Sequence, residues 1–460
     1  MEARRTWRSR LRGVWLAGIA LGWPGAALAA PPDFVLITID TLRADHLGAY
    51  GYGRNTSPNI DALASQALLV ETVLAPMPMT LPSHVSLLTS SLPARHGVLS
   101  NFRYLKIPFV PSENRDGSEG DDDALRSVAQ ILGEAGYQTA AFTSASPLAP
   151  GTGIDAGFSV FESPGAVSPS GESQRRDATT TVDRALEWLE TASSPFFLWI
   201  HVFDPHLPYE PPAPFDTAFQ TDEALHARLA TAGVPDVLQR YAAKATNLYD
   251  GEIRYTDEQL GRVFAALRER GTWDEGVIAL TADHGEGLLE HGETGHQYLW
   301  RTTIGVPLLL RWPGGPRGER STRVASLLDV MPTLAAHSQL PLGTPDRFDG
   351  VDLLDEHPAD GFGIAQEPVH SAAPRLRTYA LQTQQWKLWH RPDAPPRLYQ
   401  ATDDPHELSE VAADHPDIVE RLTQQLEKLL QQAQARPGAE VTEAIDPEQR
   451  QRLLELGYAE

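Results

Sequence analysis

The sequence predicts an α/β protein with a mostly parallel central sheet, helices on both of its faces, and a small antiparallel sheet near the C-terminus. Short apolar runs rich in β-branched residues alternate with segments that repeat apolar residues at helical spacing. This alternation is typical of parallel strands connected by helices. From about Arg375 the pattern changes to short alternating runs, which predict the antiparallel sheet.

Each predicted element has its own local signal. Continuous apolar runs predict the buried strands of the large sheet at 34–39, 139–143, 196–201, 277–281 and 306–312. Apolar periodicity predicts helices that open at Ser57-Pro58 and near Pro82, and others at 124–134, around 182–189 and over 238–267. The runs at 378–382, 386–390 and 397–399, followed by an amphipathic helix near 418–429, make up the C-terminal part.

The N-terminus predicts export. Five arginines, an apolar run from Val14 that Pro24 interrupts, and the small residues of Ala27-Leu28-Ala29 have the order of a cleavable signal peptide over residues 1–29. The run is too short for a stable membrane span, and an uncleaved anchor is the weaker alternative. We therefore expect an exported protein, located in a bacterial periplasm.

The remaining chain is long enough for a large domain, expected at 30–374, and a smaller C-terminal subdomain, expected at 375–460. The formal net charge of −23 argues against nucleic acid as a partner. A small anionic substrate is compatible with this charge, because a bound cation can reverse the local field. The chain has no cysteine, which excludes disulfides, thiolate ligands and thiol nucleophiles.

Acidic and imidazole side chains follow several of the predicted strands. Ligands of open α/β sheets bind outside the carboxyl ends of the strands, so we expect these side chains to lie close together. Carboxylates and imidazoles suit zinc or manganese. Each residue alone also has a structural explanation, as a turn cap or a satisfied histidine. The candidates are Asp40, Asp204, His206, Asp283, His284 and His296.

A proline-stiffened segment, 76–90, carries a further candidate. Pro82 suits a first helical turn, so Thr80 is expected just ahead of a helix N-terminus. Free backbone N–H groups and the positive end of the helix dipole favour an anion there. Thr80 could therefore be a nucleophile held against a phosphate or sulfate, or simply an N-cap.

Taken in order, several motifs resemble the sulfatase-like branch of the alkaline phosphatase superfamily, over nearly the whole chain after residue 29. The C-terminal Trp386-Lys387-Leu388 is similar to that branch's C-terminal subdomain. The resemblance implies an alkaline-phosphatase-like fold and makes the segment 30–374 the catalytic domain. The motifs are Ile39-Asp-Thr-Leu-Arg-Ala-Asp-His-Leu-Gly-Ala-Tyr-Gly-Tyr52, Thr80-Leu-Pro-Ser-His84, Phe203-Asp-Pro-His-Leu-Pro-Tyr209, and Ala282-Asp-His-Gly-Glu286 with Gly295-His296.

The resemblance also implies roles for individual residues. Asp40, Asp283 and His284 match metal ligands, and Thr80 matches a nucleophile that itself touches the metal. His206 and His296 match positions that bind the oxygens of the anion or, in two-metal relatives, a second ion together with Asp204. His201 has only a weak match.

The departures from the family pattern bear on the chemistry. Sulfatases carry a cysteine or serine, converted to formylglycine, where this chain has Thr80, and threonine cannot undergo that conversion. His84 replaces the arginine of the pattern, and Thr41 replaces its second acidic residue. His284 stands where the pattern usually has asparagine. One or two ions are expected, with zinc or manganese favoured over calcium, because the ligand set has fewer carboxylates and an added imidazole.

The sequence therefore predicts an exported, metal-dependent hydrolase of phosphate or phosphonate esters with a threonine nucleophile. A threonine phosphate can be hydrolysed by an activated water, whereas formylglycine chemistry is what releases sulfate in sulfatases. The alternatives, in order, are a sulfuric ester hydrolase, a phosphoryl transferase of the cell envelope and a non-catalytic binding protein.

Overall fold

The computed structural model describes residues 30–101, 103–106, 125–164, 175–220, 235–344, 347–355, 361–367, 377–436 and 440–443, together with Ala227, Ala230 and Gly438. The predicted signal peptide, 1–29, lies outside the described residues. Among the helices that are described, none combines the length and the apolarity needed to cross a bilayer.

An eight-stranded sheet forms the centre of the fold, in the order β11-β2-β10-β7-β1-β6-β4-β5. Every described neighbouring pair is parallel except the two that β10 makes with β7 and β2. The predicted, mostly parallel sheet is thus confirmed. Its strands are β1 (Phe34–Ile39), β2 (Leu68–Leu74), β4 (Gln138–Phe142), β5 (Val160–Glu162), β6 (Phe196–Val202), β7 (Val277–Ala282), β10 (Leu308–Arg311) and β11 (Glu319–Ser326).

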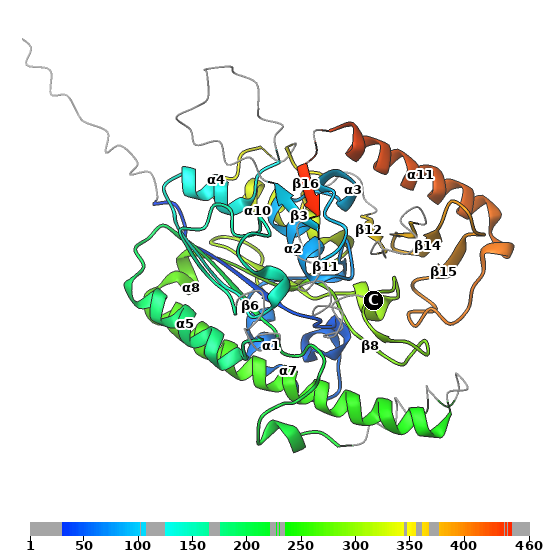
Figure 1. Cartoon of the computed structure of the whole chain (residues 1–460), viewed down its shortest axis with the longest axis horizontal. Coiled ribbons are helices and arrows are strands. Elements are labelled where there is room, and N and C mark those ends of the chain that lie inside the picture. The colour runs from blue at the N-terminus through cyan, green and yellow to red at the C-terminus, as the bar shows by residue number, and fades with distance from the viewer. Residues whose placement is uncertain are drawn as a thin grey trace, which may run out of the picture. The chain divides into compact units, whose positions relative to one another are not determined.

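Helices cover both faces of this sheet. In Figure 1, α1, α5 and the long α7 lie on one side of it, and α2, α4 and α10 lie on the other. Their bounds are α1 (Pro58–Ala64), α2 (Thr80–Thr89), α4 (Val128–Glu134), α5 (Ala178–Thr191), α7 (Asp236–Arg270) and α10 (Val330–His337). Shorter helices are α3 (Pro93–His96), α8 (Thr272–Glu275) and α9 (Arg301–Ile304).

The position of β1 explains its sequence. All six of its residues, Phe-Val-Leu-Ile-Thr-Ile, are buried, and β1 pairs in parallel with β6 on one side and with β7 on the other. A strand covered in this way needs a continuous apolar run rather than an alternating one. The edge strand β11 has the opposite character, because its first residues, Glu-Arg-Ser-Thr-Arg, are exposed or half-buried. No strand was predicted there.

The small antiparallel sheet is also confirmed, in the order β12-β13-β14-β15. Its strands are β12 (Gly363–Gln366), β13 (Tyr379–Gln382), β14 (Trp386–His390) and β15 (Arg397–Gln400). Leu422 and Leu426 of α11 (Pro416–Ala435) share a buried apolar cluster with Leu388 of β14. Strand β12 comes before residue 375, where we expected the subdomain to begin.

Two short ladders complete the described strands. The pair β3 (Arg103–Lys106) and β16 (Glu440–Glu443) is antiparallel, as is the hairpin of β8 (Gly287–Leu288) and β9 (Thr294–Gly295).

Candidate active site

The register of three neighbouring strands brings the candidate carboxylates together. Ile39, the last residue of β1, pairs with Val202 of β6 and with Ala282 of β7. The residues that follow Ile39 and Ala282 are Asp40 and Asp283, so both leave the sheet at the same edge. This is the edge at which open α/β sheets bind their ligands.

Asp40, Asp283 and His284 form a compact, fully buried group in which potential ligand atoms lie within 4.8 Å of one another. The His284 Nε2 atom lies 3.4 Å from Asp283 Oδ2 and 3.9 Å from Asp40 Oδ1. Neither oxygen of Asp40 has a hydrogen-bond partner among the described residues, and the same holds for Asp283 Oδ2 and His284 Nε2. Buried polar atoms are rarely left in this way without a functional reason.

Electrostatics at this group are unfavourable without a counter-charge. Burial, followed by the charges of Asp283 and Glu286, raises the pKa of Asp40 well above its usual range. Burial also raises the pKa of Asp283 to about 8. Two carboxylates this close and this buried resist ionising together unless a cation neutralises them.

The group therefore fits a divalent cation. The imidazole of His284 is already oriented for it, because Nδ1 lies 3.1 Å from the carbonyl oxygen of Gly285 and donates to it, which leaves the lone pair on Nε2. The other oxygen of Asp283, Oδ1, accepts from the backbone N–H groups of Thr41 (3.2 Å) and His284 (2.9 Å). Asp40, Asp283 and His284 would hold the ion.

The backbone beside Asp40 is strained. Thr41 has a φ of 54°, in the left-handed region that β-branched residues avoid. Its N–H donates to Asp283, and its carbonyl oxygen accepts from the Tyr249 hydroxyl at 2.7 Å. These contacts hold a conformation that costs about 1–3 kcal/mol, and they fix Asp40 relative to Asp283.

Thr80 is the first residue of α2, not the residue before the helix, so the predicted start at Pro82 is corrected by two residues. Proline is tolerated at 82 because the first-turn N–H groups have no partner within the helix. The Thr80 side chain is fully buried, and its hydroxyl has no hydrogen-bond partner in the described part of the chain. One turn later, the Ser83 hydroxyl donates to the Asp283 carbonyl at 2.7 Å, which ties the start of α2 to the carboxylate group.

His206 and His296 lie beside His284. The rings of His284 and His296 stack with centroids 4.2 Å apart, and those of His206 and His296 are 5.4 Å apart. His296 Nδ1 lies 3.0 Å from the Pro78 carbonyl and His206 Nδ1 lies 2.6 Å from the Leu207 carbonyl. A carbonyl only accepts, so both rings are protonated at Nδ1, and the lone pair of each neutral ring is on Nε2.

Burial lowers the pKa of both His206 and His296. For His206, burial and the nearby His296 together lower the pKa to about 3. Both rings are therefore neutral in the substrate-free protein near pH 7.

The carboxylate of Asp204 contacts the start of α5. Its carboxylate Oδ2 accepts from the backbone N–H of Ala178, the first residue of α5, at 2.8 Å. A carboxylate at a helix N-terminus stabilises the helix through the dipole. Asp204 belongs to neither group of potential metal ligands found in the described structure, and a second ion beside it stays a prediction.

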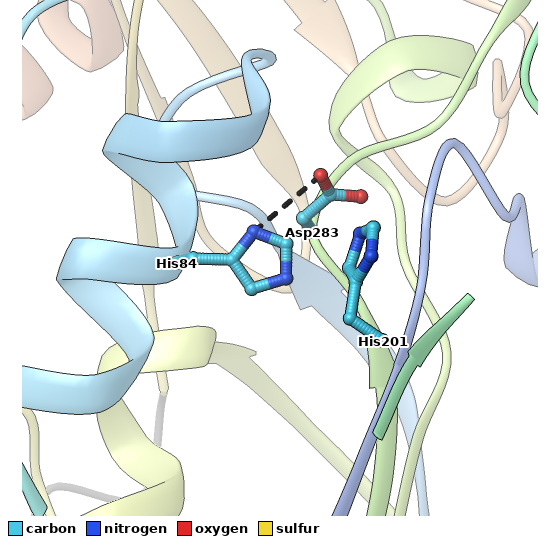
Figure 2. A group of neighbouring side chains, drawn as sticks. All are labelled: His84, His201 and Asp283. Atoms are coloured by element: carbon cyan, nitrogen blue, oxygen red, sulfur yellow. Dashed lines mark ion pairs between the residues drawn. The ribbon is translucent and has the colours of Figure 1, made fainter. Parts of the chain in front are cut away.

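A second group consists of His84, His201 and Asp283, which the sequence analysis named separately but did not bring together (Figure 2). His84 Nδ1 lies 3.7 Å from Asp283 Oδ2, and His201 Nε2 lies 3.6 Å from Asp40 Oδ2. Both nitrogens of His84 are already hydrogen-bonded, to Thr80 and to Thr38, so His84 has no lone pair to offer a cation. Its place one helical turn after Thr80 was the available signal.

Two curated proteins illustrate what this chain is similar to. Arylsulfatase K of Bos taurus is 26% identical over 295 residues, which cover 54% of this chain and 54% of that protein. The multifunctional alkaline phosphatase superfamily protein PehA of Trinickia caryophylli is 27% identical over 288 residues, 52% of this chain and 56% of that protein. This chain thus matches only about half the length of these curated relatives.

Solved structures share the fold over most of their length. A phosphonate monoester hydrolase of Agrobacterium radiobacter superposes with a TM-score of 0.69 at 22% identity, covering 87% of this chain and 96% of that one. A 2-O GAG sulfatase superposes with a TM-score of 0.66 at 17% identity, covering 88% and 92%. The family model for sulfatases matches residues 32–340, which include every residue of the site described above. The chain belongs to the sulfatase family.

Proposed function

We propose that this protein is an exported, metal-dependent hydrolase of phosphate or phosphonate esters that uses Thr80 as its nucleophile. The observation that carries the proposal is the buried Thr80 hydroxyl, which has no partner among the described residues and lies at the start of a helix tied to Asp283. With threonine at this position, the nucleophile is an unmodified hydroxyl, because threonine is not a precursor of formylglycine.

In the proposed reaction, Thr80 Oγ1 attacks the phosphorus in line with the departing ester oxygen. A Thr80–phosphorus ester forms as the bond to the leaving group breaks, and water then cleaves that ester and regenerates the hydroxyl. A divalent ion held by Asp40, Asp283 and His284 would supply the charge that favours the alkoxide form of Thr80. The positive end of α2 faces the same reaction centre.

His206 and His296 are proposed to hold the oxygens of the transferred group. Each neutral ring carries a lone pair on Nε2, which cannot donate to an anion. Proton uptake with a phosphate dianion would convert each Nε2 into a donor, because the negative charge of the substrate raises the pKa of both imidazoles. We therefore expect substrate binding to be coupled to proton uptake.

Sulfate ester hydrolysis is the second candidate. Membership of the sulfatase family and the similarity to arylsulfatase K favour it. The threonine favours phosphorus, because a threonine sulfate would have to be hydrolysed directly, without the collapse to an aldehyde that releases sulfate from a formylglycine hydrate.

A rate comparison on the purified protein tests the proposal. Aryl phosphate monoester, phosphate diester, phosphonate monoester and sulfate ester would be assayed with zinc, manganese or calcium. We expect metal-dependent turnover of a phosphorus ester that Thr80→Ala removes by about 10³-fold or more. Thr89→Ala is the matched control, since Thr89 lies in the same helix and its hydroxyl donates to the Val85 carbonyl at 2.6 Å. Preference for the sulfate ester would transfer the assignment to the second candidate.

Export is tested separately. The full chain, expressed in a Gram-negative host, should be recovered from the periplasm with Ala30 as its first residue. Recovery of the uncleaved chain in the membrane fraction would instead indicate an anchor.

A further inference from the structure

A chain of three hydrogen bonds runs from the sheet to the start of α2. Trp199 Nε1 of β6 lies 2.9 Å from Thr38 Oγ1 of β1. The same Thr38 oxygen lies 3.0 Å from His84 Nε2, and His84 Nδ1 lies 2.7 Å from the Thr80 carbonyl oxygen. All four residues have an exposed fraction of 0%, so no solvent competes with these bonds.

The two ends of this chain fix the direction of every proton in it. An indole N–H can only donate, so Thr38 Oγ1 accepts from Trp199. The hydroxyl proton of Thr38 is then directed to His84 Nε2, which accepts it. At the other end a carbonyl can only accept, so His84 Nδ1 carries the proton and donates to Thr80. His84 is thereby held as the neutral Nδ1–H tautomer.

A neutral His84 with both nitrogens hydrogen-bonded can hold the Thr80 backbone in place, which is a different role from that of a charged side chain at the same position. Its ring faces Asp283 at 3.7 Å (Figure 2) without a lone pair for a cation. The Thr80 hydroxyl has no partner among the described residues, so its position depends on the backbone that carries it. The bond from His84 to the Thr80 carbonyl is a link from that backbone to β1 and β6.

We propose that His84 is a positioning residue, which holds the nucleophile Thr80 in register with the carboxylate group through the relay Trp199, Thr38, His84, Thr80. The inference rests on the proposed function, because it takes Thr80 as the nucleophile. Without the relay, Thr80 Oγ1 is less well aligned with the phosphorus, and misplacements of about 1 Å can cost about 100-fold in rate.

Thr38→Val tests the relay at a distance from the chemistry. Valine keeps the shape of threonine but removes the hydroxyl, so His84 Nε2 loses its donor and the tautomer is no longer fixed. We expect kcat to fall by about 10- to 100-fold, while KM and the bound metal per chain stay unchanged. Thr38→Ser keeps the hydroxyl and should restore most of the lost kcat.

Thr281→Val is the matched control. Thr281 pairs with Thr38 across β1 and β7, is equally buried, and donates its hydroxyl to the Pro307 carbonyl at 2.6 Å, outside the relay. This variant also removes a buried threonine hydroxyl, with one short hydrogen bond to a carbonyl where Thr38→Val loses two bonds, and it should keep the wild-type kcat. Equal losses of kcat in Thr38→Val and Thr281→Val would reduce the effect to lost stability and overturn the relay.

Nitrogen-15 NMR of histidine-labelled protein tests the tautomer without turnover. The His84 resonances, assigned by comparison with His84→Asn, should report Nδ1–H in the wild type and a different or mixed tautomer in Thr38→Val. An Nε2–H or doubly protonated His84 in the wild type would overturn the relay. Turnover that does not depend on Thr80 would overturn the proposed function, even if the NMR result is the expected one.

Discussion

Two regions of this molecule bury charged side chains to the same degree. In one an ion pair neutralises the charges, and in the other carboxylate oxygens lack partners among the described residues. In the C-terminal part, Lys387 and Glu407 form an ion pair with side chains only 1% and 4% exposed, and Glu407 also accepts from the backbone N–H of Arg301 at 2.9 Å. At the edge of the large sheet, Asp40 and Asp283 are fully buried, and three of their four oxygens lack a partner among the described residues.

The difference separates structural burial from functional burial. In the Lys387–Glu407 pair each charge is neutralised by the other, and the pair connects β14 to α9. At the sheet edge, burial raises the pKa of Asp40 and of Asp283, and no cation among the described residues lies close enough to balance the two carboxylates. A site built to receive a cation is expected to have this excess of negative charge.

Asp40→Asn should have the largest effect on metal binding and activity. Asparagine has the shape of aspartate without its charge, so the cation loses one anionic ligand. We expect bound metal to disappear and activity to fall by about 10³-fold, while the melting temperature of the metal-free protein stays equal or rises, since an unbalanced buried charge is removed. Metal analysis and thermal unfolding in chelator measure the two effects, and retention of metal would contradict the assignment of Asp40.

Lys387→Met tests the Lys387–Glu407 ion pair by removing its positive charge. Glu407 would be left buried without its counter-charge, and breaking a buried pair in this way typically costs about 3–5 kcal/mol. Urea unfolding should show this loss, with metal affinity unchanged. The double variant Lys387→Met, Glu407→Gln should recover most of it, and a double variant as unstable as the single one would show that packing, not charge, makes the difference.

A buried histidine outside the site extends the comparison to pH. Burial, followed by the charge of Arg95, lowers the pKa of His96 to about 3. Below pH 6.5 the unfolded chain binds a proton at His96 that the folded chain does not. The contribution of neutral His96 to the free energy of unfolding is therefore fully present above pH 6.5 and is lost as the pH falls towards 3.

His96→Asn should therefore flatten the pH dependence of unfolding. In the metal-free protein, the free energy of unfolding between pH 6 and 5 should fall less steeply than in the wild type, by up to about 1.4 kcal/mol per pH unit. Urea titrations at several pH values measure the slope. An unchanged slope would show that His96 is protonated in the folded state.

Thr41→Gly probes the strain beside Asp40 and should have the smallest effect. Glycine adopts positive φ freely, so relief of strain should exceed the added entropy of the unfolded chain, with a net gain of about 0.5–1 kcal/mol. Thr41→Val keeps the β-branched strain and, like Thr41→Gly, removes a buried hydroxyl that has no partner among the described residues. It therefore serves as control and should gain less than Thr41→Gly. Equal stability of both variants would mean that the backbone at 41 relaxes at no cost.

Much of the site was predictable because it follows from strand ends. The apolar runs that end before Asp40 and Asp283 identify two buried parallel strands, and parallel strands end at a common edge. Thr80 was identifiable because Pro82 marks a first helical turn. Local sequence carries these signals, so no knowledge of the tertiary structure was needed.

The remainder depends on contacts between distant residues. Trp199, Thr38 and His84 are separated by 161 and 46 positions, and no local pattern distinguishes such a relay from ordinary core residues. Asp204 has the same local context, a strand end followed by proline, whether it binds an ion or the N-terminus of α5. Edge strand β11 lacks a continuous apolar run because most of its first residues face solvent.

The imidazoles of His206, His284 and His296 all donate from Nδ1 to backbone carbonyls. Backbone acceptors cannot be lost through amino-acid replacement, so the orientation of these rings does not depend on the identity of neighbouring side chains. The surrounding loops are therefore free to diverge and to admit new leaving groups while the reactive centre keeps its geometry. Evolution of substrate range in this chain should proceed through those loops, with little need for compensating changes at the centre.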